Sequence, residues 1–196
     1  MKTALLFSIL AILLLPASVH AYIPPGERMV EQWTAAYERS RNVTITGHYE
    51  EAGDKVSFQV EGSRNQVSIM EGGNPTQDAT SLLVWGALLR PSSLTRQWHQ
   101  AGHLDLERTG LARHGDRIAW TLGVEGEQRE GTQVWLDRQR QTPFLLIPPP
   151  ELYTARRISF EGYEASDNRA FPTQIKVTGT GGFERTYTIE TISVRR

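Results

Sequence analysis

Residues 78–91, DATSLLVWGALLRP, decide the fold of this chain. Asp78 is a typical helix N-cap, and Pro91 ends a helix at or before the residue that precedes it. Between them, the side chains of residues 82–89 are apolar on nearly every side. A helix without a polar face must be buried or must cover an apolar surface. We therefore predict a helix here that packs onto a larger apolar surface.

That surface is predicted by the residues before the helix, which have the alternating pattern of strands. Apolar residues occupy every second position of short segments, and turn residues separate the segments at 52–54 and 62–63. The alternating residues are Ile45, Val56, Phe58, Val60, Val67 and Ile69. This pattern predicts an antiparallel meander of three strands, of which the first covers about residues 43–51.

After the helical region the strand pattern returns and continues to the end of the chain. The segment 118–124 alternates without a break, and further alternating segments predict about seven strands in all. In the last one, Tyr187 and Ile189 have one parity, whereas Ile192 and Val194 have the other. A change of parity within one strand indicates an extra residue, so we expect a β-bulge near Thr191.

Two further helices are predicted from apolar residues spaced three or four apart. The first covers residues 27–40 and has a single apolar stripe. Its stripe consists of Met29 or Val30, Trp33 and Tyr37. The second follows Pro91, with Ser92 or Ser93 as its N-cap, and closes at Gly102. It has Leu94 and Trp98 on one side.

Together these elements predict a mainly β fold of the α+β class, with about ten or eleven antiparallel strands. A sheet of that size tends to curl, and its concave face must be filled by side chains, helices or a ligand. We therefore expect a curved sheet wrapped round the N-terminal helix and the helical insert.

The first 21 residues are predicted to be a cleavable signal peptide. Lys2 is followed by an apolar run over residues 4–15 and a small-x-small site that ends at Ala21. A membrane-spanning helix needs about 20 apolar residues, so an uncleaved anchor is the weaker alternative. The mature chain would then be one domain, residues 22–196, in the periplasm. It contains no cysteine, and so has neither a disulfide nor the lipid-modified residue of a lipoprotein.

Composition and motifs argue against several other functions. The 21 basic and 22 acidic residues are interspersed and form no basic stripe for nucleic acid. His99 and His103 have the spacing of zinc ligands, but Gly102 interrupts the helix and no glutamate holds the position of a protease base. No Gly-x-Ser-x-Gly motif is present. We therefore expect neither an enzyme nor a metal or cofactor site.

The order of elements resembles the LolA/LolB superfamily of bacterial envelope proteins, which also includes the lipid-sensing domain of RseB. Besides the two helical regions, the matching pieces are strand segments. They are VTITG at 43–47, QVWLD at 133–137, TPFLL at 142–146 and FPTQIKV at 171–177. The resemblance implies an unclosed antiparallel β half-barrel that covers the N-terminal helix, with the helical insert as a lid over an apolar cavity that accepts acyl chains. In this family LolA carries lipoproteins from the inner to the outer membrane.

The candidate ligand-binding residues fall into two groups. The first group is the concave wall, for which the opposite strand parity is an open alternative. It consists of Phe58, Val60, Val67, Ile69, Trp120 and Leu122. The second group is the helical lid. It consists of Leu83, Trp85, Leu88, Leu89 and Trp98. Large aromatics often simply fill a core, so core filling is the alternative for each tryptophan.

The sequence therefore favours a monomeric periplasmic carrier that binds a lipid or the acyl chains of a lipoprotein and shuttles them between envelope membranes. A membrane transport protein would be its partner. Burying an acyl chain stabilises a complex by about 0.8 kcal/mol per CH₂, so binding is easy and release needs a moving lid. The alternative is a non-catalytic interaction or sensor module of the same fold, which binds a protein partner or assists a transport complex.

Overall fold

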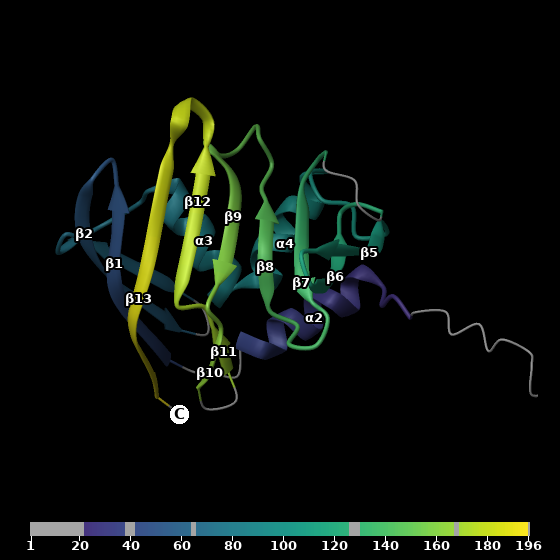
Figure 1. Ribbon diagram of the computed structural model, residues 1–196, viewed down its shortest axis with the longest axis horizontal. Helices are drawn as coiled ribbons and strands as arrows, with labels where there is room; N and C mark the ends of the chain where they lie inside the picture. Colours follow the sequence, from purple (N-terminus) through teal and green to yellow (C-terminus); the bar gives the residue numbers. More distant parts are fainter. Residues whose placement is uncertain (1–21, 38–41, 64–65, 126–129, 167–168, 196) are drawn as a thin grey trace, which may run out of the picture.

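The computed structural model describes residues 22–37, 42–63, 66–125, 130–166 and 169–195. Within these residues, eleven strands form one open antiparallel sheet in the order β4-β3-β2-β1-β13-β12-β9-β8-β7-β6-β5 (Figure 1). The first four strands are β1 (Asn42–Glu51), β2 (Asp54–Ser63), β3 (Val67–Glu71) and β4 (Asn74–Pro75). The others are β5 (Thr109–His114), β6 (Arg117–Leu122), β7 (Gln133–Asp137), β8 (Pro143–Ile147), β9 (Ala155–Glu161), β12 (Gln174–Gly179) and β13 (Glu184–Arg195). A separate pair consists of β10 (Glu164–Ser166) and β11 (Arg169–Phe171). The predicted α+β half-barrel is confirmed.

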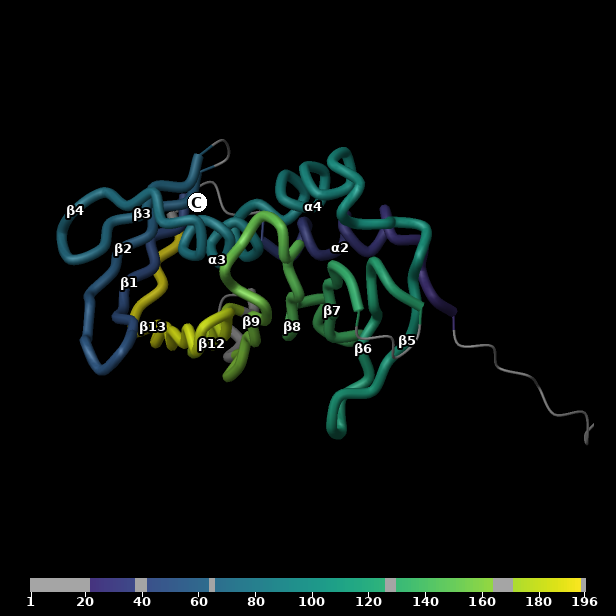
Figure 2. The backbone as a smooth tube through the Cα atoms, turned by 90° about the horizontal axis from the view of Figure 1, so that it is seen from above, coloured from purple at the N-terminus to yellow at the C-terminus, as the bar shows by residue number. Residues whose placement is uncertain are grey.

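Three helices lie together on one face of the sheet (Figures 1 and 2). They are α2 (Gly26–Tyr37), α3 (Ala79–Leu89) and α4 (Pro91–Gln100). Figure 2 shows the sheet curving beneath them, so that their apolar sides and the concave face of the sheet enclose one core. A short 3₁₀ turn, η1 (Thr180–Gly182), joins the neighbouring strands β12 and β13 at the top of the sheet in Figure 1.

The expected bulge in the last strand is present and lies next to Thr191. Thr46 of β1 pairs with Thr191, but the next residue, Gly47, pairs with Ile189 and leaves Glu190 unpaired. The backbones approach closely here, because a Cβ on Gly47 would lie 2.0 Å from the carbonyl oxygen of Thr188. Only glycine fits that approach. This extra residue changes which alternate positions of β13 face the core, as the apolar pattern predicted.

Helix α3 begins and ends where the sequence indicated. A side-chain oxygen of Asp78 accepts a hydrogen bond from the backbone N–H of Ser81 at 2.9 Å, which caps the first turn. Among the apolar side chains of residues 82–89, only that of Leu82 is exposed, at 41%. The helix is therefore largely buried, as expected for one without a polar face.

The predicted start of the next helix was wrong by two or three residues. Helix α4 begins at Pro91 with Arg90 at the N-cap position, and no side chain caps it. Neither Ser92 nor Ser93 is the cap, because proline has no N–H to satisfy and a fixed φ that suits the first helical position. Leu94 and Trp98 are buried, as predicted.

Helix α2 has the single apolar stripe that its sequence predicted. Met29, Trp33 and Tyr37 are buried, whereas Val30 is only partly buried. The predicted end of this helix, residues 38–40, lies outside the described residues, as does the predicted signal peptide, residues 1–21. None of the helices in the described ranges is long and apolar enough to cross a bilayer.

Candidate functional site

The residues predicted for the wall and the lid all point toward the core between the helices and the sheet. Ten of them are buried members of one apolar cluster, so the predicted strand parity is correct. They are Phe58, Val60, Ile69, Leu83, Trp85, Leu88, Leu89, Trp98, Trp120 and Leu122. Val67 is only partly buried and packs at the margin of this cluster, because it lies on β3 near one edge of the sheet.

The first part of this core lies between α3 and strands β1, β2 and β13. The ring of Trp85 on α3 lies 5.1 Å from that of Phe58 and 5.8 Å from that of Tyr187, measured between centroids. On the neighbouring strand pair, Val60 is directly opposite Ile69. Helix α3 therefore covers this part of the concave face, and its side chains fill the space that the sequence analysis assigned to a ligand.

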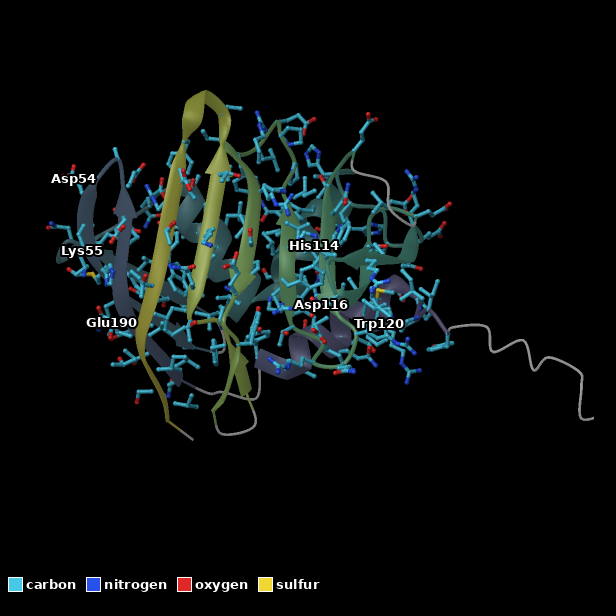
Figure 3. The ribbon with its side chains drawn as sticks, in the orientation of Figure 1. Asp54, Lys55, His114, Asp116, Trp120 and Glu190 are labelled. Carbon is cyan, nitrogen blue, oxygen red and sulfur yellow. The ribbon has the colours of Figure 1, made fainter. Side chains whose placement is uncertain are left out.

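The second part of the core lies at the other end of the sheet. Figure 3 shows Trp120 at the opposite end of the long axis from Asp54 and Lys55, which mark the β1–β2 hairpin. A Cβ on Gly26, the first residue of α2, would lie 2.7 Å from a methyl carbon of Leu122, so α2 covers this end. Trp120 and Leu122 thus belong to the wall beneath α2, and Phe58 and Ile69 to the wall nearer α3.

A buried arginine lies where α3 begins. Arg185 of β13 is 7% exposed and donates to Glu51 through Nε at 3.0 Å and through Nη2 at 2.7 Å. Its Nη1 atom donates to Asp78 Oδ2 at 2.8 Å, to Tyr187 at 3.0 Å and to Ser81 Oγ at 3.1 Å. We call these five residues the Arg185 network.

The Arg185 network ties α3 to the sheet. Asp78 is the N-cap of α3, and Ser81 is in its first turn, whereas Glu51 ends β1 and Arg185 is the second residue of β13. A charge-assisted hydrogen bond is shorter and stronger than a neutral one, so several on one guanidinium hold the helix start firmly. The Ser81 hydroxyl also donates to Glu71 of β3 at 2.5 Å. The helix is thus anchored at its start by polar groups, and its buried apolar side chains pack along its length.

Sequence reasoning did not find this network, although one signal was present. Arg185 has the same parity as Tyr187 and Ile189 in β13, so strand alternation directs it toward the concave face. An arginine at an inward position needs partners, because a buried charge without them is costly. Its partners could not be named, since Glu51 is 134 residues away in the chain.

Known structures share this arrangement of sheet and helices. A LolA superfamily protein from Nitrosomonas europaea is 13% identical, with 88% of this chain and 94% of that chain covered and a TM-score of 0.55. The chain has the LolA fold. A DUF1329 family protein from Desulfovibrio piger is 9% identical over 88% of this chain and 94% of its own, with a TM-score of 0.56. An outer membrane lipoprotein-sorting protein domain from Vibrio parahaemolyticus is 8% identical over 87% and 93%, with a TM-score of 0.54. No protein-family model matches the chain, and no curated protein matches its sequence.

Within this LolA fold, three buried indole groups of the described residues have an N–H without an acceptor. They belong to Trp33 of α2, Trp85 of α3 and Trp120 of β6. A buried donor without a partner costs about 1–3 kcal/mol, and most buried polar groups in proteins are paired. Two of these N–H groups lie on helices, and the third lies on a strand of the concave wall. The interface between helices and sheet therefore holds polar atoms that a carbonyl oxygen could satisfy.

The histidines that invited a metal hypothesis have other roles. His99 Nδ1 is hydrogen-bonded to the carbonyl oxygen of Leu104 at 3.0 Å, just beyond the end of α4. His103 Nδ1 lies 3.8 Å from a carboxylate oxygen of Glu151. Among the residues that the structure describes, no three histidine or carboxylate side chains come together as a metal site.

Tyr187 makes the stability of the LolA fold sensitive to alkaline pH. Burial raises the pKa of Tyr187 from 10.0 to about 12. The folded state therefore favours the neutral phenol of Tyr187. The stabilisation of the fold that results is complete below pH 10 and is lost as the pH rises from 10 to 12. We expect the free energy of unfolding, measured by urea titration, to fall across this range. Burial also raises the pKa of Tyr37 and Tyr163, so Tyr187→Phe should reduce the slope and not abolish it. An unchanged slope in this variant would contradict the assignment to Tyr187.

Proposed function

We propose that this chain is an exported, non-enzymatic carrier that binds an acyl chain of a lipid or lipoprotein between α3 and the concave face of the sheet. It would shuttle this cargo through the periplasm as a monomer, from one membrane transport protein to another. The observation that carries the proposal is helix α3, which is apolar on almost every side and covers the concave face near Phe58 and Tyr187. An acyl chain could take the place of such a helix on the sheet, because it offers the sheet an apolar surface in exchange.

The energetics of α3 explain how a carrier could release its cargo. An acyl chain of about 14 carbons gains on the order of 10 kcal/mol on leaving water, which alone would make release very slow. If the chain displaces α3, the apolar side chains of the helix lose their contacts with the sheet. The net gain on binding is then the difference between two burials, and repacking of α3 assists release. The indole N–H of Trp85 would find an acceptor in the ester carbonyl of the cargo.

The fold comparison supports the same proposal. One protein with this fold is described as an outer membrane lipoprotein-sorting domain. Residues 1–21 support export, because they have the pattern of a signal peptide cleaved after Ala21. The mature chain, residues 22–196, would lack the cysteine that anchors a lipoprotein, and so could move between membranes.

The test is to purify the mature protein from a native envelope fraction without detergent and to analyse an organic extract by mass spectrometry. We expect a phospholipid, fatty acid or acylated peptide in stoichiometric amount. A protein that is folded by circular dichroism but yields no acyl compound would contradict the carrier. That result would favour the alternative, a sensor or interaction module that binds a protein partner, and affinity capture from the same fraction would then identify it.

A further inference from the structure

A small hollow lies on the face of the sheet opposite to the three helices, where β6 and β8 begin and β7 ends. Val134 and Leu136 of β7 belong to the core beneath the helices, so strand alternation directs Asp137 to the opposite face. The hollow is lined by this residue, by the β7–β8 turn, by the first residues of β6 and β8, and by Tyr163. Its volume is about 150 Å³. One water molecule needs about 10–15 Å³, so a small ion fits with room to spare.

Two arginines line the hollow from different elements of the fold. Arg117 is the first residue of β6, and Arg140 lies in the turn between β7 and β8. No carboxylate in the described part of the chain forms a salt bridge with either of them. Asp137 is the one acid among the described residues of the lining. The lining therefore has two positive charges against one negative charge, and its net charge favours an anion.

The single acid of the lining holds the turn that carries one of the arginines. Asp137 Oδ1 accepts hydrogen bonds from the backbone N–H groups of Gln139 and Arg140, both at 2.9 Å. These bonds offset part of the negative charge of Asp137. The turn closes through a third bond, from the backbone N–H of Gln141 to the carbonyl oxygen of Asp137 at 2.7 Å. Arg140 Nη1 in turn donates to the carbonyl oxygen of Tyr163 at 3.2 Å. The Arg140 guanidinium is thus positioned at the hollow before any ligand binds, which lowers the entropic cost of binding.

Two aromatic side chains complete the lining without adding a charge. The Tyr163 hydroxyl donates to the carbonyl oxygen of Pro143, and burial raises the pKa of Tyr163 well above its usual range, so this phenol stays neutral. Phe144 is 5% exposed and packs edge-on against Trp135 in a second apolar cluster, on this face of the sheet. An apolar wall beside a guanidinium lowers the local dielectric constant and so strengthens its attraction for an anion.

We propose that this hollow binds a phosphate group between Arg117 and Arg140. The planar fork of a guanidinium matches the oxygens of a phosphate and donates two hydrogen bonds to it. A phosphate monoester carries a charge of about −1.5 to −2 at pH 7, so two arginines hold it more strongly than they hold a singly charged carboxylate. The hollow and the proposed cargo site lie on opposite faces of the sheet. The phosphate site therefore stands or falls independently of the carrier function.

The test is isothermal titration calorimetry with inorganic phosphate, in a chloride buffer of physiological ionic strength that screens distant charges. We expect at least about tenfold weaker binding to Arg117→Gln and to Arg140→Gln, because each variant loses charge-assisted hydrogen bonds to the ligand. Arg138→Gln is the matched control, since Arg138 lies in the same turn but does not line the hollow. It should bind phosphate like wild type. Arg117→Lys keeps the charge without the fork and should bind with intermediate affinity.

Two further ligands identify the source of the phosphate and complete the test. Glycerol 2-phosphate is a small monoester, and binding at least as tight as that of inorganic phosphate would support a phosphate carried on a larger molecule. Weaker binding of the ester would support free phosphate. Acetate should bind more weakly than inorganic phosphate, and the reverse order would overturn the choice of phosphate. A wild-type protein that binds no phosphate, or an equal loss in Arg138→Gln and Arg117→Gln, would overturn the site itself.

Discussion

Replacing Arg185 with methionine is expected to lower the free energy of unfolding by about 3 kcal/mol. Removing one member of a buried ion pair costs about 3–5 kcal/mol, because it leaves its partner charged and unpaired. The side chains of Glu51 and Asp78 are 34% and 36% exposed, so the lower part of that range applies. The change would also remove a donor from Ser81 and Tyr187. Urea denaturation measures the effect.

The same variant should loosen α3 selectively. Because the network holds the start of this helix, hydrogen exchange of α3 amides should accelerate more than exchange in β12 or β13. Lys176→Met is the matched control, since it removes a cation from an exposed pair with Glu161 at 3.1 Å and should change stability by less than about 0.5 kcal/mol. Exchange in α3 equal to that of wild type would show that the network does not anchor the helix.

Replacing Trp85 with alanine is expected to destabilise the protein by about 3–5 kcal/mol, the usual loss for a buried aromatic. Trp85 is fully buried and packs edge-on or tilted against Phe58 and Tyr187, so its removal leaves a cavity between α3 and the sheet. Urea denaturation and near-UV circular dichroism measure the change.

The control for Trp85 lies on the exposed side of the same helix. Leu82→Ala removes a side chain that is 41% exposed and should cost much less than Trp85→Ala. Similar losses in the two variants would mean that α3 does not stabilise the fold through its contact with the sheet. In that case α3 could not act as a lid whose displacement a ligand must offset.

Much of the architecture could be predicted because it depends on local patterns. The alternation of Phe58 with Val60 determined which side of β2 faces inward, and the parity change after Ile189 located the bulge. Asp78 and Pro91 marked the ends of α3 because capping and the lack of a proline N–H are properties of single residues. The start of α4 was misplaced for a similar local reason, since two serines after a proline offered plausible caps that the helix does not use.

The candidate sites were less predictable than the fold. The wall and lid residues were predicted as ligand contacts, and the structure places ten of them in one buried apolar cluster. Their division between the α3 end and the α2 end of the sheet was not foreseen. The role of the wall and lid residues as ligand contacts stays a prediction that mass spectrometry of the organic extract will test.

By itself, the sequence determined a series of antiparallel strands with one apolar face and a nearly all-apolar helix that must pack on such a face. Period-two alternation and the absence of a polar face on residues 82–89 are local patterns that predict these two features in any arrangement of the strands. Only the tertiary structure decided that Arg185 meets both Glu51 and Asp78. Those contacts depend on strand order, register and helix rotation, which bring together residues more than a hundred positions apart and which no local pattern encodes.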